Sequence, residues 1–159
     1  MTFIETQEGW LYLSGVLDTY SRKIVGWAME KSHDAELVKT ALRLALLNRQ
    51  PAAGLIHHSD RGSEYASTSY QTLLQEPNIQ ASMSNTGDCY DNAMMEGFWA
   101  TLKEECCGQT IFASRNEAKT AIFEYIEVYY NRKRIHSSLG YMSPVDYEKR
   151  GERREEVFS

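Results

Sequence analysis

The sequence predicts an α/β fold in which a mixed five-stranded sheet is flanked by helices and followed by a C-terminal helical tail. Two observations predict it. Three short strand-like segments lie together near the N-terminus, and helix-like and strand-like segments then alternate before a run of helical patterns. The 159 residues, 42% of them hydrophobic, are enough for one globular domain with a substantial core.

The first three segments are expected to form an antiparallel meander. They are rich in β-branched and aromatic residues and cover 2–6, 10–17 and 23–29. Gln7-Glu8-Gly9 separates the first pair, and Asp18–Arg22 separates the second. Because these connections consist of turn-forming residues, neighbouring segments should pair directly.

Helices and strands are then expected to alternate. A helix over 33–49, capped by Ser32, has an apolar stripe at helical spacing that comprises Val38, Ala41, Leu42 and Ala45. The run "GLIHHS" predicts a buried strand ending at His58. The remaining elements of this part are a helix over 63–75, a strand over 79–84 and a loop at "NTGDCYDN".

The C-terminal part is expected to be helical. Asp91 is the predicted cap of a helix that runs to about Glu105, and Ser114 and Glu117 form a capping box for a long helix. The stripe of that long helix comprises Ala118, Ala121, Ile122, Tyr125 and Tyr129. Ser143-Pro144 opens a short last helix. We place the core at 1–110 and its helical extension at 111–159.

Composition limits the possible partners and surroundings. No apolar stretch is long enough to span a bilayer, and three cysteines without a Cys-x-x-Cys spacing fit a reducing cytoplasm. The net charge is −5, of which residues 131–159 contribute +2 and residues 1–130 contribute −7. A domain that gripped DNA alone would be more basic, so a DNA-binding role would need help from another segment or subunit.

Two acids are candidates for a metal site. Asp60, in "HHSDRGSEY", follows the predicted buried strand, and Glu96 lies in the first turns of the helix that begins at Asp91. One helix, one strand and a loop separate them, a path that can return the chain to the same sheet edge. Two carboxylates meeting there would repel each other unless they held a cation such as Mg²⁺, which prefers oxygen ligands. The alternative is a turn aspartate and a solvated helix glutamate.

The sequence resembles a known family in three stretches. "HHSDRGSEY", "SMSNTGDCYDNAMMEGFWATLKEE" and "YYNRKRIHSSLGYMSPVDYE" are similar to the catalytic core of bacterial insertion-sequence transposases of the retroviral-integrase type, the DDE superfamily. The resemblance runs from about residue 2 to residue 148. The thirty-five residues between Asp60 and Glu96 are characteristic of the group.

The resemblance implies a ribonuclease-H-like fold and metal-dependent DNA cleavage and strand transfer. Asp60 and Glu96 would be catalytic and would hold two Mg²⁺ or Mn²⁺ ions roughly 3.5–4 Å apart. It also implies transposon ends and target DNA as substrates, full-length transposase subunits as homo-oligomeric partners, no membrane, and a nucleoid-associated place in a bacterial cytoplasm.

The same resemblance places the family's first catalytic acid one position before Met1. Asp18 matches a different position, at a turn, and is not a substitute for it. We therefore expect weak or absent transposase activity from this polypeptide alone. A non-catalytic remnant that only binds DNA or pairs with full-length subunits remains an alternative. A junction resolvase would fit the fold but not the 131–148 segment.

Several further residues are candidates for DNA contact. Lys103 lies two helical turns after Glu96, where the retroviral relatives carry a DNA-contacting lysine; it would otherwise pair with a neighbouring glutamate. Asn92 would orient substrate or serve as a second cap, and Arg61 would touch a phosphate or form a tight turn. Within "NRKRIHSSLGY", Arg132, Arg134 and His136 would contact the DNA backbone or simply suit the preceding helix dipole. His57 and His58 lack partners for a zinc site.

Overall fold

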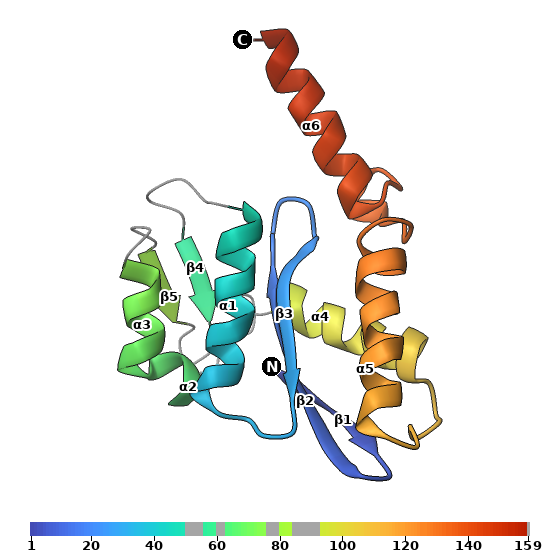
Figure 1. The fold of residues 1–159 in the computed structure, drawn as a ribbon. Coiled ribbons are helices and arrows are strands. Elements are labelled where there is room, and N and C mark those ends of the chain that lie inside the picture. The colour runs from blue at the N-terminus through green and yellow to red at the C-terminus, as the bar shows by residue number, and fades with distance from the viewer. Residues whose placement is uncertain (50–55, 60–62, 76–79, 84–92, 159) are drawn as a thin grey trace.

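The computed structural model describes residues 1–49, 56–59, 63–75, 80–83 and 93–158, with the side chains of 1–49, 63–75 and 93–152 (Figure 1). Its elements in chain order are β1 (Thr2–Thr6), β2 (Gly9–Leu17), β3 (Ile24–Glu30), α1 (Ala35–Arg49), β4 (Ile56–Ser59), α2 (Ser63–Ala66), α3 (Thr68–Gln75), β5 (Gln80–Met83), α4 (Ala93–Leu102), η1 (Lys103–Cys107), α5 (Arg115–Phe123), η2 (Glu124–Tyr130), η3 (Ser137–Leu139) and α6 (Pro144–Phe158).

The predicted N-terminal meander is confirmed. β1 pairs with β2 and β2 pairs with β3, both antiparallel, with Thr2 opposite Leu13 and Leu13 opposite Met29. Gly9 closes the first hairpin at a φ of +115°, a conformation that favours glycine. Burial alternates strictly along β1, which gives the sheet two distinct faces.

The five predicted strands are all present, but they are not joined in one sheet as predicted. Within the described residues, β1, β2 and β3 form a three-stranded sheet, and β4 pairs in parallel only with β5. No pairing links β1 to β4 in the described backbone. β4 and β5 have four residues each and β1 has five, so each offers few hydrogen bonds with which to extend a ladder.

Helix α1 covers one face of the three-stranded sheet. Its predicted stripe is buried, with Val38 1% and Leu42 2% exposed. Close approach is possible because β3 carries Gly26, whose missing Cβ would lie 2.4 Å from the carbonyl oxygen of Ala41. The predicted cap Ser32 is wrong: Asp34 Oδ1 accepts the backbone N–H of Leu37, and Ser32 only donates to Asp34.

Helices α4 and α5 cover the opposite face (Figure 1). Their shared core comprises Ile4, Leu11, Leu13, Ile24, Phe98, Trp99, Leu102, Ala118, Ile122, Tyr125, Ile126 and Tyr130. The predicted cap Ser114 is confirmed, since its side chain accepts the N–H of Glu117. Residues on both sides of position 110 contribute to this core, and the domain boundary placed there stays a prediction.

A π-helical segment shifts the buried stripe of the long helix. The predicted stripe ended at Tyr129, which is 43% exposed, whereas Ile126 is fully buried and Tyr130 is 3% exposed. After Phe123 the chain continues as η2, whose wider turn rotates the following side chains relative to a regular α-helix. The expectation for Tyr129 was therefore wrong by one position.

Two other helices differ from their predicted extents. The helix expected over 63–75 is broken at Ser67, whose hydroxyl donates to the carbonyl of Glu64 while it accepts the N–H of Tyr70. The last helix begins at Pro144 as predicted, but it has fifteen residues rather than being short. It extends away from the rest of the chain (Figure 1). Among the described helices, none is long and apolar enough to cross a membrane.

Candidate metal and DNA-binding site

Glu96 lies exposed in the first turn of α4. The helix is fixed to the three-stranded sheet by the buried side chains of Phe98, Trp99 and Leu102. Gly15 on β2 leaves room there for Trp99, whose ring would be 3.1 Å from a Cβ at that position. Within the described residues, no hydrogen bond or ion pair joins the exposed Glu96 carboxylate to another group.

The predicted partner of Glu96, Asp60, lies outside the described residues, as do Arg61 and Asn92. The described strand β4 ends at Ser59, the residue that precedes Asp60 in the sequence. In the described part of the chain, no three His, Cys, Asp or Glu residues are grouped closely enough to hold an ion. The pairing of Asp60 with Glu96 therefore stays a prediction.

Within the described residues, Lys103 does not make the ion pair with a neighbouring glutamate that was the alternative to DNA contact, and the DNA contact stays a prediction. It opens the π-helical segment η1, and its ammonium nitrogen lies 4.9 Å from the centre of the Phe3 ring on β1. No ion pair joins it to a glutamate in the residues whose side chains are described. The interaction is thus a cation–π contact, which leaves the charge free to attract an anion.

Arg134 is held by an acid. Its Nε donates to both carboxylate oxygens of Glu105, at 3.0 and 2.9 Å, and the hydroxyl of Tyr125 donates to the same carboxylate at 2.6 Å. The hydrogen bond from the Arg134 guanidinium is the main reason that the pKa of Glu105 is below its usual range. A DNA phosphate would therefore have to share Arg134 with Glu105, and a DNA contact by Arg134 stays a prediction.

His136 is half-buried and packs its ring edge against Tyr130, with centroids 5.2 Å apart. Burial, followed by repulsion from Arg134 and Arg22, lowers the pKa of His136. The lowered pKa favours the neutral imidazole, and a DNA contact by His136 stays a prediction.

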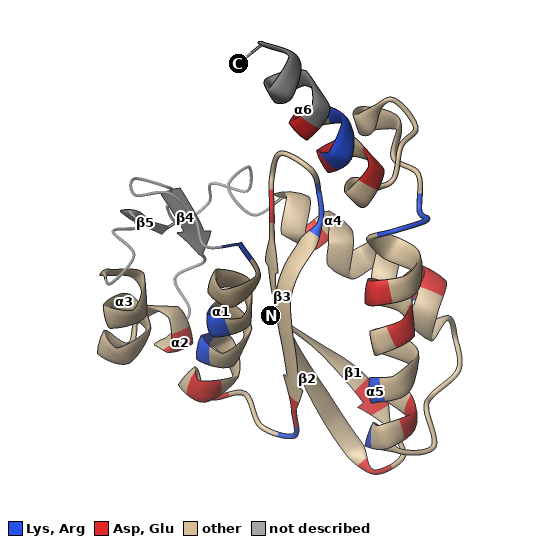
Figure 2. Cartoon of the chain, turned by 45° about the horizontal axis from the view of Figure 1, so that its top comes forward, with Lys and Arg blue, Asp and Glu red and all other residues tan. Residues whose placement is uncertain are grey.

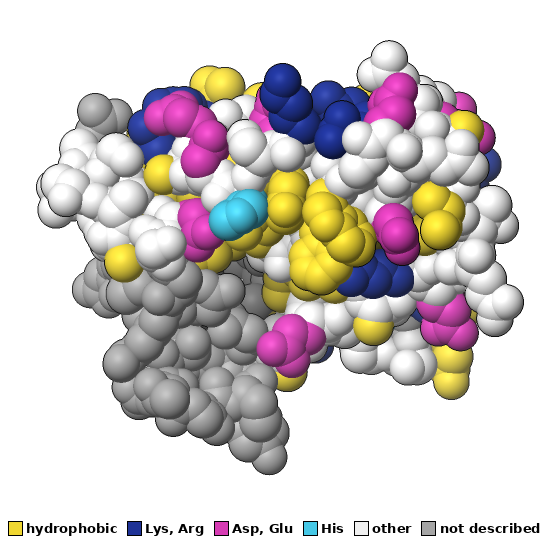
Figure 3. Space-filling view, turned by 90° about the horizontal axis from the view of Figure 1, so that it is seen from below, with side chains coloured by type: hydrophobic (Ala, Val, Ile, Leu, Met, Phe, Trp, Pro, Cys, Tyr) yellow, Lys and Arg dark blue, Asp and Glu magenta, His cyan; other side chains and the backbone are white. Residues whose placement is uncertain are grey.

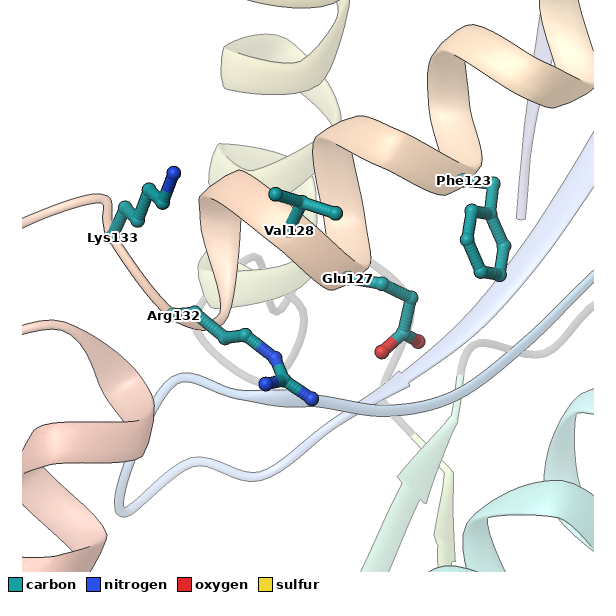
Figure 4. Close-up of a pocket in the computed structure, with 5 residues that line it drawn as sticks. All are labelled: Phe123, Glu127, Val128, Arg132 and Lys133. Carbon is teal, nitrogen blue, oxygen red and sulfur yellow. The ribbon is translucent and has the colours of Figure 1, made fainter.

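Arg132 lines a surface pocket of about 470 Å³ together with Phe123, Glu127, Val128 and Lys133 (Figure 4). Glu127 accepts a hydrogen bond from the indole nitrogen of Trp27 at 2.8 Å.

Basic residues gather in the connection after η2, whereas acidic residues lie along the length of α5 (Figure 2). This distribution agrees with the charge asymmetry of the sequence.

Asn131 is a structural residue that the sequence did not single out. It is 2% exposed, and its amide nitrogen donates to the carbonyl of Ile24 while its amide oxygen accepts the N–H of Ile24. In this way one side chain imitates a neighbouring strand at the edge of β3. Its place directly after a helix, at the start of a basic run, gave no signal of this role.

Comparisons with known proteins define the class. An integrase core domain model matches residues 1–89, more than half of the chain, and a second integrase core domain model matches residues 77–144. The chain therefore belongs to the integrase core domain family.

Curated relatives specify the kind of integrase core. The chain is 50% identical over 149 residues to the transposase for insertion sequence element IS904 of Lactococcus lactis, covering 94% of this chain and 59% of the relative. It is 48% identical to the IS600 uncharacterized 31 kDa protein of Shigella sonnei, covering 94% and 55%. It is 44% identical to transposase InsF for IS3A of Escherichia coli, covering 93% and 51%. The chain thus spans between about half and three-fifths of these relatives.

Solved structures agree on the fold. The chain of a simian T-cell lymphotropic virus intasome, solved with a PP2A regulatory subunit, matches with a TM-score of 0.72 at 14% identity, covering 92% of this chain and 51% of that one. The HTLV-2 integrase catalytic core in complex with magnesium matches with a TM-score of 0.65 at 14% identity, covering 92% and 90%. The BIV integrase core matches at 0.63 and 18% identity, covering 98% and 95%. The ribonuclease-H-like fold class is confirmed.

Proposed function

We propose that this chain is the catalytic core of a DNA transposase that cleaves and joins DNA strands with divalent metal ions. The observation that carries the proposal is Glu96, an exposed carboxylate without a partner in the described residues, on a helix anchored to the sheet of an integrase core. Glu96 also lies in the first turn of α4, at the electropositive end of the helix, where an anionic group is favourable.

Asp60 and Glu96 would hold the ions between them, with water and DNA phosphate completing the shell. The exposed Glu96 fits this role, since Mg²⁺ takes oxygen ligands and keeps several waters. When bound, the ions would lower the pKa of an attacking water and stabilise the departing DNA 3′-oxygen at the phosphodiester. A DNA 3′-hydroxyl would replace water as the nucleophile in strand transfer.

The protein residues around this pair would position the DNA. Lys103, with its charge unpaired in the described residues, would hold a phosphate near the metals, and Arg132 would contact the backbone further away. Arg61, Asn92, Arg134 and His136 are the remaining proposed contacts. The substrates would be transposon ends and target DNA, and the working form would be a homo-oligomer with full-length subunits.

The test is nicking of a supercoiled plasmid that carries the DNA flanking the gene, with Mg²⁺ or Mn²⁺. The chain is assayed with an upstream Trp-Val-Thr-Asp extension, which adds the first acid of the family pattern. We expect nicking by this extended chain, and its loss in the extended Glu96→Gln and Asp60→Asn variants. Extended Glu104→Gln, an exposed neighbour, is the control. Nicking that persists in both site variants would contradict the proposal, and thermal unfolding of each protein checks that it is folded.

A further inference from the structure

Two half-exposed aromatic rings lie side by side at the β1–β2 hairpin. Phe3 is 50% exposed and Trp10 is 45% exposed, and their ring centroids are 5.0 Å apart in an edge-to-face arrangement. Both belong to the sheet face that α1 covers further along the strands, so this end of the face is open. Figure 3 shows hydrophobic side chains gathered in the middle of the face seen from below, with charged side chains around them.

Cations lie at both ends of this aromatic pair. The Lys103 ammonium is 4.9 Å from the centre of the Phe3 ring, and the Arg115 guanidinium donates through Nε to the carbonyl of Trp10 at 3.1 Å. Two acids are also near: Glu5 pairs with Trp10 across the hairpin, and Glu8 accepts the backbone N–H of Arg115. A phosphate would therefore be attracted at the Lys103 end, where no acid is paired with the ammonium in the described residues.

We propose that Phe3 and Trp10 form a stacking platform for an unpaired DNA base, with Lys103 holding the adjoining phosphate. Exposed aromatic rings next to a cation are the combination with which proteins bind single-stranded DNA, because every base has a π-face and every nucleotide a charge. Lys103 lies two turns after Glu96, roughly 10 Å along the helix, so it would connect the platform to the proposed cleavage site. The inference rests on the proposed function and adds that the strand near the cut is unpaired.

A second aromatic pair in the molecule provides a matched control. Phe123 is 52% exposed and lies 5.8 Å from the ring of Trp27, much as Phe3 lies beside Trp10. The neighbouring charges differ: Trp27 donates its indole N–H to the carboxylate of Glu127, and Arg132 and Lys133 line the same pocket as Phe123. Because an acid shares this pocket with the cations, we expect Phe123→Leu to weaken binding of single strands less than Phe3→Leu does.

The experiment measures binding of a short fluorescein-labelled oligothymidylate by anisotropy to the chain and to Phe3→Leu, Trp10→Leu, Lys103→Gln and Phe123→Leu. We expect each platform leucine variant to weaken binding roughly fivefold to tenfold, the lower part of what one stacked base contributes. Lys103→Gln should reduce the salt dependence by about one phosphate contact. A blunt duplex of the same length should bind Phe3→Leu and Trp10→Leu as it binds the unmodified chain.

Two results would overturn the platform. One is unchanged oligothymidylate binding in Phe3→Leu and Trp10→Leu. The other is a change in oligomeric state in these variants with DNA binding intact, which would make the surface a protein interface. Plasmid nicking by the extended chain separates the two proposals: nicking that depends on Glu96, together with unchanged binding in both leucine variants, removes only the platform.

Discussion

At the scale of single residues, Asn131 is a buried polar side chain whose loss should be costly. Asn131→Ala would leave both the N–H and the C=O of Ile24 unsatisfied in a buried place, where each such group costs about 1–3 kcal/mol. We expect the free energy of unfolding, measured by urea titration, to fall by at least about 2 kcal/mol.

The control for Asn131 is Asn116→Ala, which changes an exposed asparagine on α5 and should alter stability by no more than about 0.5 kcal/mol. Equal effects of the two substitutions would show that the Asn131 amide does not support β3.

Glu105 should make stability depend on pH. Its pKa is lowered in the folded state by Arg134, so the carboxylate stabilises the native protein above its unfolded pKa. That contribution is lost as the pH falls through the lower folded pKa. We expect Glu105→Gln to melt below the wild type at pH 7, and the two melting curves to converge in acid.

Glu104→Gln, a change at the adjacent exposed glutamate, should follow the wild type at every pH. A Glu105→Gln deficit that stayed constant from pH 7 down into the acid range would contradict the assigned ion pair.

At the scale of secondary-structure elements, the contact between α1 and β3 depends on one missing methyl group. A Cβ at Gly26 would lie 2.4 Å from both the Ala41 carbonyl oxygen and the Ala45 amide nitrogen, which are backbone atoms that cannot move aside singly. Gly26→Ala should therefore destabilise the fold by roughly 1–3 kcal/mol or more.

Gly97→Ala should act in the opposite direction. A Cβ there meets nothing within 4 Å, and alanine is favoured over glycine inside a helix by up to about 1 kcal/mol. Thermal unfolding of both variants tests the pair, and a melting temperature that rose in Gly26→Ala would refute the close approach.

The elements also show what sequence patterns could and could not predict. Strand alternation and the Val38–Ala45 stripe were sufficient to predict the meander and the face of α1. The π-helical segments could not be predicted from an α-helical period: in η2, Ile126 and Tyr130 are buried and Tyr129 is not. The cap at Asp34 was missed because two candidates two positions apart, Ser32 and Asp34, both suit a helix start.

At the scale of the whole molecule, α6 is tied to the body through Glu148. This carboxylate accepts from the Ser21 hydroxyl at 2.6 Å and from the guanidinium of Arg49, which also pairs with Asp18 at 3.5 Å. Ring contact between Tyr147 and Tyr20 lies beside it. The Glu148 carboxylate thus connects α6 both to the turn between β2 and β3 and to the C-terminal end of α1.

Glu148→Gln should loosen the first half of α6, because an amide replaces the charge that Arg49 and Lys23 face. We expect faster amide hydrogen exchange over residues 144–152, with α5 unchanged. Glu152→Gln, at an exposed position of the same helix, is the control. Unaltered amide exchange over residues 144–152 in Glu148→Gln would contradict the proposal that Glu148 holds α6 to the rest of the chain.

The candidate site residues were predicted from sequence motifs, and the structure shows the surroundings of those that lie within its described residues. Motif spacing singled out Glu96 and Lys103, and the structure places Glu96 exposed and Lys103 over Phe3. Spacing along the chain did not predict that Arg134 is held by Glu105, since twenty-nine positions separate the two residues. Contacts of that kind depend on the tertiary arrangement that brings η2 and the residues after it next to η1.

The most direct test of the proposed metal site is Mn²⁺ binding to the chain, followed by electron paramagnetic resonance of the free ion. We predict that Asp60→Asn and Glu96→Gln each weaken binding by at least about tenfold, since changes merely next to a metal ligand often cost that much. Glu104→Gln should bind as the unmodified chain does. Mn²⁺ affinity that is the same in all four proteins would contradict a metal held between Asp60 and Glu96.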